Sequence, residues 1–465
     1  DPSWSLEDAR NSAIVYKPST IANASGPHVS DPRSGEIIES HINWYHNVMS
    51  LVHNWYFVQC SPVDPLARSM TFPSELMGQL VRFVSSHEVG HTLGLRHNFG
   101  ATSYYTTEQL RDPEFLRANG HTASIMDYSR FNFVVQPEDN VSRELLFPRL
   151  SHYDNWAIEW GYRRLYQFAD VQEEIPYLNQ WVIEKTKDPY LRFNGGSESG
   201  LNDPRAQSED LGDNQMETCE LGIRNLKVIM QNLPEWTKVP NENYRGLSTL
   251  YPQITSQFSR YIGHVSKWVA GVYVDAKTVE QEGPIYVNVS KNKQKEAMAF
   301  LERHIFTTPL WLLPDYLSEL LPSSRLSIME NLQNSAITGL VNENVLVRML
   351  RAEEQLGPAA YSAEEFFKDM NRYVFGDYGQ TDIYCRSLQN IYVNTLCKMI
   401  TPEKPSDSAT TVAMMRRMSV SIENNDVKAL VAAELETIAK KLKRGRGDDR
   451  TRAHYNYLIK TIENL

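Results

Sequence analysis

The clearest hydrophobic pattern of the chain lies between Pro73 and Gly94. Apolar residues and histidines recur there at spacings of 4, 4, 3 and 4, which is typical of one face of a helix. The residues of this face are Leu76, Leu80, Val84, His87 and His91. The Pro-Ser pair favours a helix start, and Gly94 favours a stop because glycine accepts the left-handed backbone that turns the chain. Both histidines therefore extend an apolar stripe that faces inward.

Shorter patterns predict the elements on either side of this helix. Strand-like runs cover residues 12–16 and 36–44, and turn signals cover residues 24–27 and 31–35. We expect these segments to form the strands and turns of a small sheet.

Helical spacing returns further along the chain. It covers residues 154–166, and near the C-terminus residues 427–442 and 455–462, which together predict a terminal helical hairpin. Residues 186–216 are polar and glycine-rich and show no periodicity. Long unpatterned stretches are typical of linkers or functional loops, so this segment is the best candidate for a domain boundary.

Composition agrees with a globular protein of two or three domains. The chain has 465 residues, 41% of them hydrophobic and 22% charged, which allows a large core. The formal net charge of −10 argues against nucleic acid as the main partner. No apolar run approaches the roughly 18 residues that a transmembrane helix needs. The chain opens at Asp1 without an initiator methionine or signal-peptide pattern, so we expect either a processed protein or a recombinant product, from which any targeting segment has been removed.

The decisive chemistry lies in residues 86–100, SHEVGHTLGLRHNFG. A catalytic zinc needs three protein ligands and an open fourth position. His87 and His91 are four residues apart, so both can reach one ion from one face of a helix. Glu88 can direct its carboxylate toward a metal-bound water. Gly94 then reverses the chain, and His97 arrives as the third ligand.

The segment HEVGHTLGLRH matches the extended HExxHxxGxxH signature of the metzincin metallopeptidases, which this chain resembles. That clan has a second mark, a methionine turn under the metal, for which residues 124–128 (SIMDY) are the candidate. The resemblance implies that Met126 forms a hydrophobic floor beneath the three imidazoles without binding zinc. It also implies, by similarity to the astacin and serralysin branches, that Tyr128 donates a hydrogen bond to the oxyanion. The alternative for Tyr128 is a side chain that only lines the cleft wall.

Further segments resemble a group of exported bacterial zinc-dependent metalloproteases with a long uncharacterised C-terminal region. These segments are residues 31–37 (DPRSGEI), 124–133 (SIMDYSRFNF) and 156–163 (WAIEWGYR). The resemblance implies an extracytoplasmic location, in the periplasm, on the cell surface or in the medium. A complete metzincin domain opens with a strand and a long helix. No such helix is evident before Ser12, so we expect the chain to start inside its catalytic domain.

The fold expected from these patterns and this resemblance is α+β. Residues 1–165 should form a metzincin-like zinc peptidase domain, with a twisted mixed sheet behind the active-site helix. Residues 166–216 should connect it to a mainly α-helical C-terminal region at residues 217–465.

The expected activity is that of a zinc-dependent endopeptidase with one catalytic Zn²⁺ and a peptide or protein substrate. Zinc would lower the pKa of its bound water to near 7, and Glu88 would take the proton and pass it to the leaving amine. We expect the peptide to lie along an edge strand, for which residues 36–42 are the candidate. Residues 130–133 are expected to line the specificity pocket.

Two other interpretations stay open. The chain could be a catalytically silent metzincin scaffold that binds a protein or peptide, or a zinc hydrolase with a narrow non-peptide substrate. The presence of Glu88 weighs against the silent scaffold, because a site that no longer catalyses a reaction can lose its general base. The patterns do not indicate a cleavage preference or an oligomeric state.

Several residues with metal-binding chemistry lack the spacing of a site. We expect ordinary surface or core roles for the nine other histidines, which are His28, His41, His46, His53, His121, His152, His264, His304 and His454. The spacing of Asp210, Asp213 and Asn214 does not fit a calcium loop, so we expect these residues to form a solvated turn. The four cysteines have no CxxC spacing, which leaves one or two disulfides open. They are Cys60, Cys219, Cys385 and Cys397.

Overall fold

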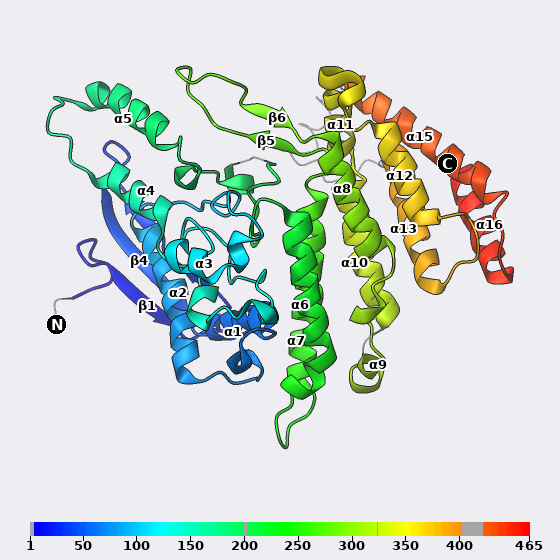
Figure 1. The fold of residues 1–465 in the computed structure, drawn as a ribbon, viewed down its shortest axis with the longest axis horizontal. Coiled ribbons are helices and arrows are strands. Elements are labelled where there is room, and N and C mark those ends of the chain that lie inside the picture. Colours follow the sequence, from blue (N-terminus) through cyan, green and yellow to red (C-terminus); the bar gives the residue numbers. More distant parts are fainter. Residues whose placement is uncertain (1–3, 200–201, 323, 402–421) are drawn as a thin grey trace. The chain divides into compact units, whose positions relative to one another are not determined.

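The structure, a computed structural model, describes residues 4–199, 202–322, 324–401 and 422–465. It contains two compact units. Unit 1 comprises Asp1–Tyr261 and Val274–Ile285, and unit 2 comprises Ile262–Tyr273 and Tyr286–Leu465. Together they confirm the α+β class and the mainly helical C-terminal region (Figure 1).

The elements of unit 1 begin with a small sheet and continue with helices. They are β1 (Ala13–Lys17), β2 (Ala24–Ser25), β3 (His28–Ser30), β4 (Ile37–Tyr45), α1 (Val48–Cys60), α2 (Ser74–Thr92), α3 (Pro113–Asn119), α4 (His152–Tyr162), α5 (Val171–Lys185), α6 (Gln215–Trp236) and most of α7 (Arg245–Ser266). The division between the units falls inside α7, at Tyr261.

The sheet of unit 1 is mixed, and β4 is its central strand. β1 pairs with β4 in parallel, from Ala13 opposite His41 to Lys17 opposite Tyr45. On the other side, β2 and β3 pair with β4 in antiparallel register, with an irregularity at Ser30. The prediction that residues 36–42 form an edge strand is therefore wrong. The β2–β3 segment, which the turn signals at residues 24–27 concealed, pairs with β4 on the side away from β1 and also contacts the active-site helix.

Two helices, α1 and α2, follow the sheet in the chain and contribute residues to the cavity beside Glu88. α2 packs against α1, β2 and β4, as the stripe from Leu76 to His91 predicts. The 13-residue helix α1 was not predicted. It buries residues on most of its circumference, including Val52, Tyr56 and Phe57, so its apolar residues show little helical period.

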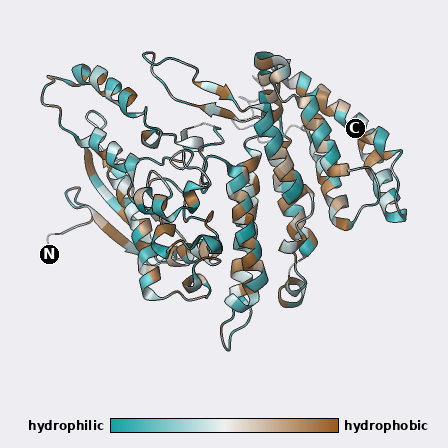
Figure 2. Ribbon diagram, in the orientation of Figure 1, coloured by the Kyte–Doolittle hydropathy of each residue, from teal (hydrophilic) through white to brown (hydrophobic). Residues whose placement is uncertain are grey.

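Unit 2 is a stack of helices. It contains α8 (Lys291–Leu301), α9 (Tyr316–Leu320), α10 (Arg325–Leu340), α11 (Glu343–Leu356), α12 (Ala363–Phe375), α13 (Ile383–Ile400), α15 (Ile422–Leu442) and α16 (Asp449–Glu463). At its start lie β6 (Tyr286–Asn288) and its partner strand β5 (Val272–Val274), whose last residue is counted with unit 1. α10 packs on α13, α13 on α15, and α15 on α16, so the predicted terminal hairpin is present. Apolar and polar residues alternate along these helices (Figure 2).

Residues 166–216 lie within unit 1, together with α6. This differs from their expected role as a connection to a helical region starting at residue 217. The reason is that their second half is largely buried, including Asp203, Gln207 and Asp210, so it packs as part of the unit. Among the described residues, no helix combines the length and apolar composition needed to cross a bilayer.

Candidate metal centre

The site is built on the C-terminal half of α2. His87 and His91 lie one turn apart on the buried side of this helix, and His87 is almost fully buried. Gly94, with φ of +85°, ends the turn, and the Leu95 amide donates to the Gly90 carbonyl at 3.0 Å. This reversal brings His97 back toward α2.

The Nδ1 atoms of the three histidines each have an acceptor. His87 Nδ1 donates to the Ile125 carbonyl at 2.8 Å, and His91 Nδ1 donates to the Leu95 carbonyl at 2.9 Å. His97 Nδ1 lies 2.8 Å from both carboxylate oxygens of Glu198. Because these acceptors require a proton on Nδ1, the Nε2 atoms are left with free lone pairs.

Those three Nε2 atoms face one another. His97 Nε2 lies 3.0 Å from His91 Nε2 and 3.3 Å from His87 Nε2. Burial lowers the pKa of His87 to about 3 and also lowers the pKa of His91, so both rings favour the neutral form that ligates metals. Lone pairs of neutral imidazoles at such separations repel each other, and a cation between the rings relieves that repulsion. The donor set therefore fits a metal ion such as zinc.

Glu198 is a part of this centre that the sequence patterns did not reveal. It belongs to the short helix η6 (Gly196–Ser199), inside the polar segment taken for a boundary. A carboxylate on the Nδ1 of a ligating histidine fixes the orientation of the ring and raises its basicity. The signal that could have found it is the NGGSE run at residues 194–198, whose paired glycines allow close backbone approach.

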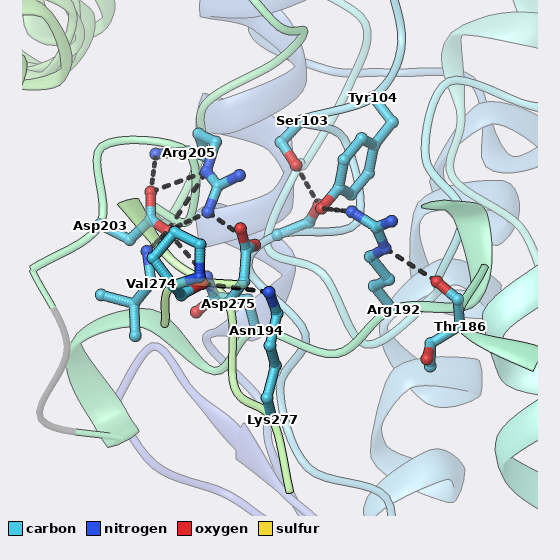
Figure 3. A network of polar contacts seen from close by, with 12 residues as sticks. Ser103, Tyr104, Thr186, Arg192, Asn194, Asp203, Arg205, Val274, Asp275 and Lys277 are labelled. Carbon is cyan, nitrogen blue, oxygen red and sulfur yellow. Dashed lines mark hydrogen bonds and ion pairs between the residues drawn. The ribbon is translucent and has the colours of Figure 1, made fainter. Parts of the chain in front are cut away.

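The loop that presents Glu198 is tied to the loop after His97. The Asn98 side chain donates to the Arg192 carbonyl at 2.9 Å and accepts from the main-chain N–H of Asn194 at 2.9 Å. The Gly100 amide donates to the Asn194 carbonyl at 3.1 Å. Asn194 in turn donates to Asp203 at 3.2 Å (Figure 3). These bonds fix the position of Glu198 relative to His97.

Asp203 anchors this loop from behind. It is buried, and its carboxylate accepts from the Arg205 guanidinium at 2.8 Å and from the Val274 amide at 2.8 Å. Arg205 also pairs with Asp275 at 3.0 Å, as Figure 3 shows. The network is therefore continuous from the histidine loop to residues 274–275 within unit 1.

Met126 lies beneath the histidines, where the methionine turn was expected. A methyl group added to Gly90, between the two histidines of α2, would lie 2.2 Å from Met126 Sδ. The methionine therefore packs directly on the backbone of α2. The Met126 carbonyl accepts from the Asn98 amide at 3.1 Å, which ties this turn to the loop after His97.

A buried carboxylate holds the methionine turn in place. Asp154, in the first turn of α4, accepts from Ser124 Oγ at 2.7 Å, from the Ile125 amide at 2.8 Å and from the Ser151 amide at 2.9 Å. Sequence patterns placed Asp154 only at the start of a helix. Its role at the turn depends on a contact across 30 residues, which no local pattern encodes.

Glu88 lies beside the histidines in a buried position. Burial raises the pKa of its carboxyl to about 7, while a hydrogen bond from the Gly26 amide opposes that shift. A methyl group on Gly26 would lie 2.3 Å from the Glu88 carbonyl oxygen, so the β2–β3 segment passes directly over α2. A carboxyl with a pKa near neutrality can both accept and return a proton.

Tyr128 stands next to the histidine rings. Its ring centroid is 4.3 Å from that of His97 and 5.1 Å from that of His87. Tyr128, Glu88 and Arg130 line a cavity of about 270 Å³ that reaches the His87 ring. Of residues 130–133, expected to line a specificity pocket, Arg130 lines this cavity, whereas Phe131, Asn132 and Phe133 are buried in the core.

The residues with unsuitable spacing do not join this cluster. Within the described part of the chain, His87, His91 and His97 form the one group of three or more histidine, cysteine or acidic side chains close enough to share an ion. His28 donates to the His91 carbonyl at 2.9 Å, so it supports the helix rather than the metal. All four cysteines are free thiols.

Comparison with known proteins agrees with this geometry. The profile of a family described as Met-zincin matches residues 69–382, more than half of the chain, including the histidines, the methionine turn and Glu198. No curated protein and no solved structure matches the chain. The extent of the family match shows that this chain belongs to the Met-zincin family.

Proposed function

We propose that this protein is a zinc-dependent endopeptidase. The observation that carries the proposal is the convergence of three Nε2 lone pairs beside a buried carboxyl, at the mouth of a cavity. His87, His91 and His97 would hold the ion. Family membership supports a zinc metallopeptidase scaffold, and the convergence supports a working site on it.

Zinc bound there would polarise the scissile carbonyl and lower the pKa of its water to near 7. Glu88 would accept the proton of that water at its carboxylate and would deliver it to the nitrogen of the leaving amine. Its burial matches the pKa of the carboxyl to this exchange near neutral pH. Tyr128, against the His97 ring, would donate a hydrogen bond from its hydroxyl to the substrate oxyanion.

The sheet offers a place for an extended substrate. Among the described strands, β2 and β3 pair only with β4, so their outer edge is open. The segment also contacts α2 at the site, through Gly26 and His28. A peptide added as a further strand along residues 24–30 would pass the metal, with main-chain hydrogen bonds that do not depend on its sequence.

Digestion of a peptide library by the zinc-loaded chain tests this proposal, with products identified by mass spectrometry. We expect internal cleavage that a chelator abolishes and that Glu88→Gln reduces by about 100-fold or more, since general-base catalysis contributes on that order. Zinc content should be the same in both proteins. Zinc binding without cleavage would contradict the proposal and favour the silent scaffold that binds peptides.

A further inference from the structure

The cavity beside Glu88 has apolar walls and one cationic side chain. Its volume is about 270 Å³, and helices α1 and α2 contribute Val48, Leu51, Trp55, Phe83 and Val84. Arg130 is the one arginine or lysine among the lining residues, and Glu88 is the one carboxylate. A cationic side chain with little exposed surface is costly to bury, so its presence calls for an explanation.

Arg130 is held in an unusual conformation. Its φ of +57° is left-handed, which is uncommon for a residue with a side chain. The guanidinium is stacked between two rings, with its central carbon 3.4 Å from the Trp55 centroid and 4.6 Å from the Tyr128 centroid. This sandwich fixes the plane of the guanidinium beside the cavity.

The hydrogen-bonding capacity of Arg130 is largely unused. Its Nε lies 3.4 Å from Glu209 Oε1, at the long end of hydrogen-bond distances, and this nitrogen is sealed from solvent. Among the described residues, no acceptor receives a hydrogen bond from either of its Nη groups. The side chain keeps 13% of its surface exposed. The paired Nη groups are therefore free for a ligand.

Arg130 shares its ion-pair partner with a second guanidinium group. Glu209, its one carboxylate partner, forms a shorter pair with Arg260, at 2.6 Å. Two guanidinium groups thus share the Glu209 carboxylate, while Glu88 lines the same cavity as Arg130. A carboxylate ligand could accept two parallel hydrogen bonds from the Nη groups of the guanidinium fork.

We propose that Arg130 makes this cavity a recognition site for a carboxylate on a short apolar stem, which in a peptide substrate is a glutamate side chain next to the cleaved bond. The apolar walls would contact the methylene groups, and Arg130 would bind the carboxylate. The inference rests on the proposed peptidase function and names its substrate class. A free peptide C-terminus carries the same chemistry, so the test must separate these two sources.

The test uses peptides that differ only in the residue next to the cleaved bond, which is Glu, Gln, Leu or Lys. Each peptide is made with an amidated and with a free C-terminus. Cleavage by the zinc-loaded wild type gives kcat/KM, and binding to zinc-loaded Glu88→Gln gives Kd without turnover. For amidated peptides we expect Glu to be favoured over Gln by about 10- to 100-fold in both quantities, as for a buried charge-assisted pair. A preference that appears only with a free C-terminus would overturn the glutamate assignment.

Arg130→Met should abolish the preference for Glu and leave Gln or Leu favoured. Glu209 keeps Arg260 as its partner in this variant, so the substitution does not leave that carboxylate unpaired. Arg130→Lys keeps the charge and should retain a smaller preference. Arg68→Met is the matched control, because Arg68 also stacks on a ring, that of Trp236 at 5.0 Å, but does not line the cavity.

The outcomes separate the inference from the function on which it rests. Cleavage that favours Leu over Glu in the wild type overturns the inference and leaves the peptidase function intact. Binding that favours Glu without any cleavage supports the inference and contradicts the peptidase function. A Glu preference that survives in Arg130→Met also overturns the inference.

Discussion

Unit 1 and unit 2 bury their polar groups in different ways. In unit 1, long irregular segments carry buried polar side chains that bond to the main chain, as Asn98, Asp154 and Asp203 do. In unit 2, helices pack through apolar faces, and a buried polar cluster joins Asn371, Tyr392 and Glu434. In unit 1, hydrogen bonds from side chains therefore hold irregular backbone segments in position. In unit 2, the backbone groups are paired mainly by hydrogen bonds within the helices.

This difference explains where the chemistry lies. Irregular backbone leaves N–H and C=O groups unpaired unless side chains meet them. The residues that meet them in unit 1 also orient the candidate ligands, since Asn98 ties the His97 loop and Asp154 ties the methionine turn. Substitutions in this network should change the metal centre, and substitutions in unit 2 should change only stability.

The largest expected effect is that of Asp154→Ala. The variant leaves Ser124 Oγ and the amides of Ile125 and Ser151 without their acceptor in a buried position. We expect a loss of about 3–5 kcal/mol in the free energy of unfolding, as for a buried charged acceptor with several donors. Urea unfolding monitored by circular dichroism measures it. A loss below about 1 kcal/mol would show that apolar packing alone holds the turn.

Glu198→Ala should weaken zinc binding about 10- to 100-fold, the usual effect of removing the hydrogen-bond partner of a ligating histidine. Glu198→Gln should weaken it less, because an amide oxygen still accepts from His97 Nδ1. Competition with a chromophoric chelator measures the affinity. Since the Glu198 side chain is 45% exposed, the thermal midpoint of the metal-free protein should hardly change.

Glu217→Ala is the control for Glu198. Glu217 bonds to Thr107 at the surface of the same unit and should leave zinc affinity unaltered. Equal losses of zinc affinity in the two variants would mean that the net charge of the protein, and not the contact with His97, causes the effect.

Two glycines of α2 give a matched pair. Gly90→Ala places a methyl group against Met126 Sδ and should destabilise the protein by about 1–3 kcal/mol. Gly78→Ala meets nothing within 4 Å and should stabilise it by up to about 1 kcal/mol through helix propensity. Thermal unfolding of both variants measures the contrast. Equal effects would show that Met126 does not press on the helix.

The last effect belongs to unit 2 and depends on pH. Burial raises the pKa of Glu434 to about 7, so the folded state holds this proton more tightly than the unfolded state. Stability from this group is present at low pH and is lost as pH rises from about 4.5 to about 7. Glu434→Gln should therefore gain about 1–3 kcal/mol relative to wild type at pH 8, and little at pH 4.5. Urea unfolding at both pH values decides this, and zinc affinity should be unchanged.

Sequence patterns anticipated the regular parts of the molecule. The stripe from Leu76 to His91 predicted α2 because its period is that of a helix with one buried face. The helix α1 escaped because it is buried on most sides, and the β2–β3 edge escaped because its residues also carry turn signals.

The candidate ligands were predictable for a local reason. His87, His91 and His97 lie within 11 residues (87 to 97), where helix and turn geometry fix their mutual positions. Glu198 was not predictable, since it reaches His97 across 101 residues through a loop without periodicity. The same holds for the stacking of Arg130 on Trp55, which only the folded chain creates.

Metal analysis of the purified chain after dialysis against buffered zinc tests the central claim most directly. The three imidazoles predict one zinc ion per chain in the wild type and almost none in His87→Ala or His97→Ala. His28→Ala should keep its zinc, because His28 contacts only the backbone of the site. Zinc that remains bound in a variant lacking all three histidines would contradict the account.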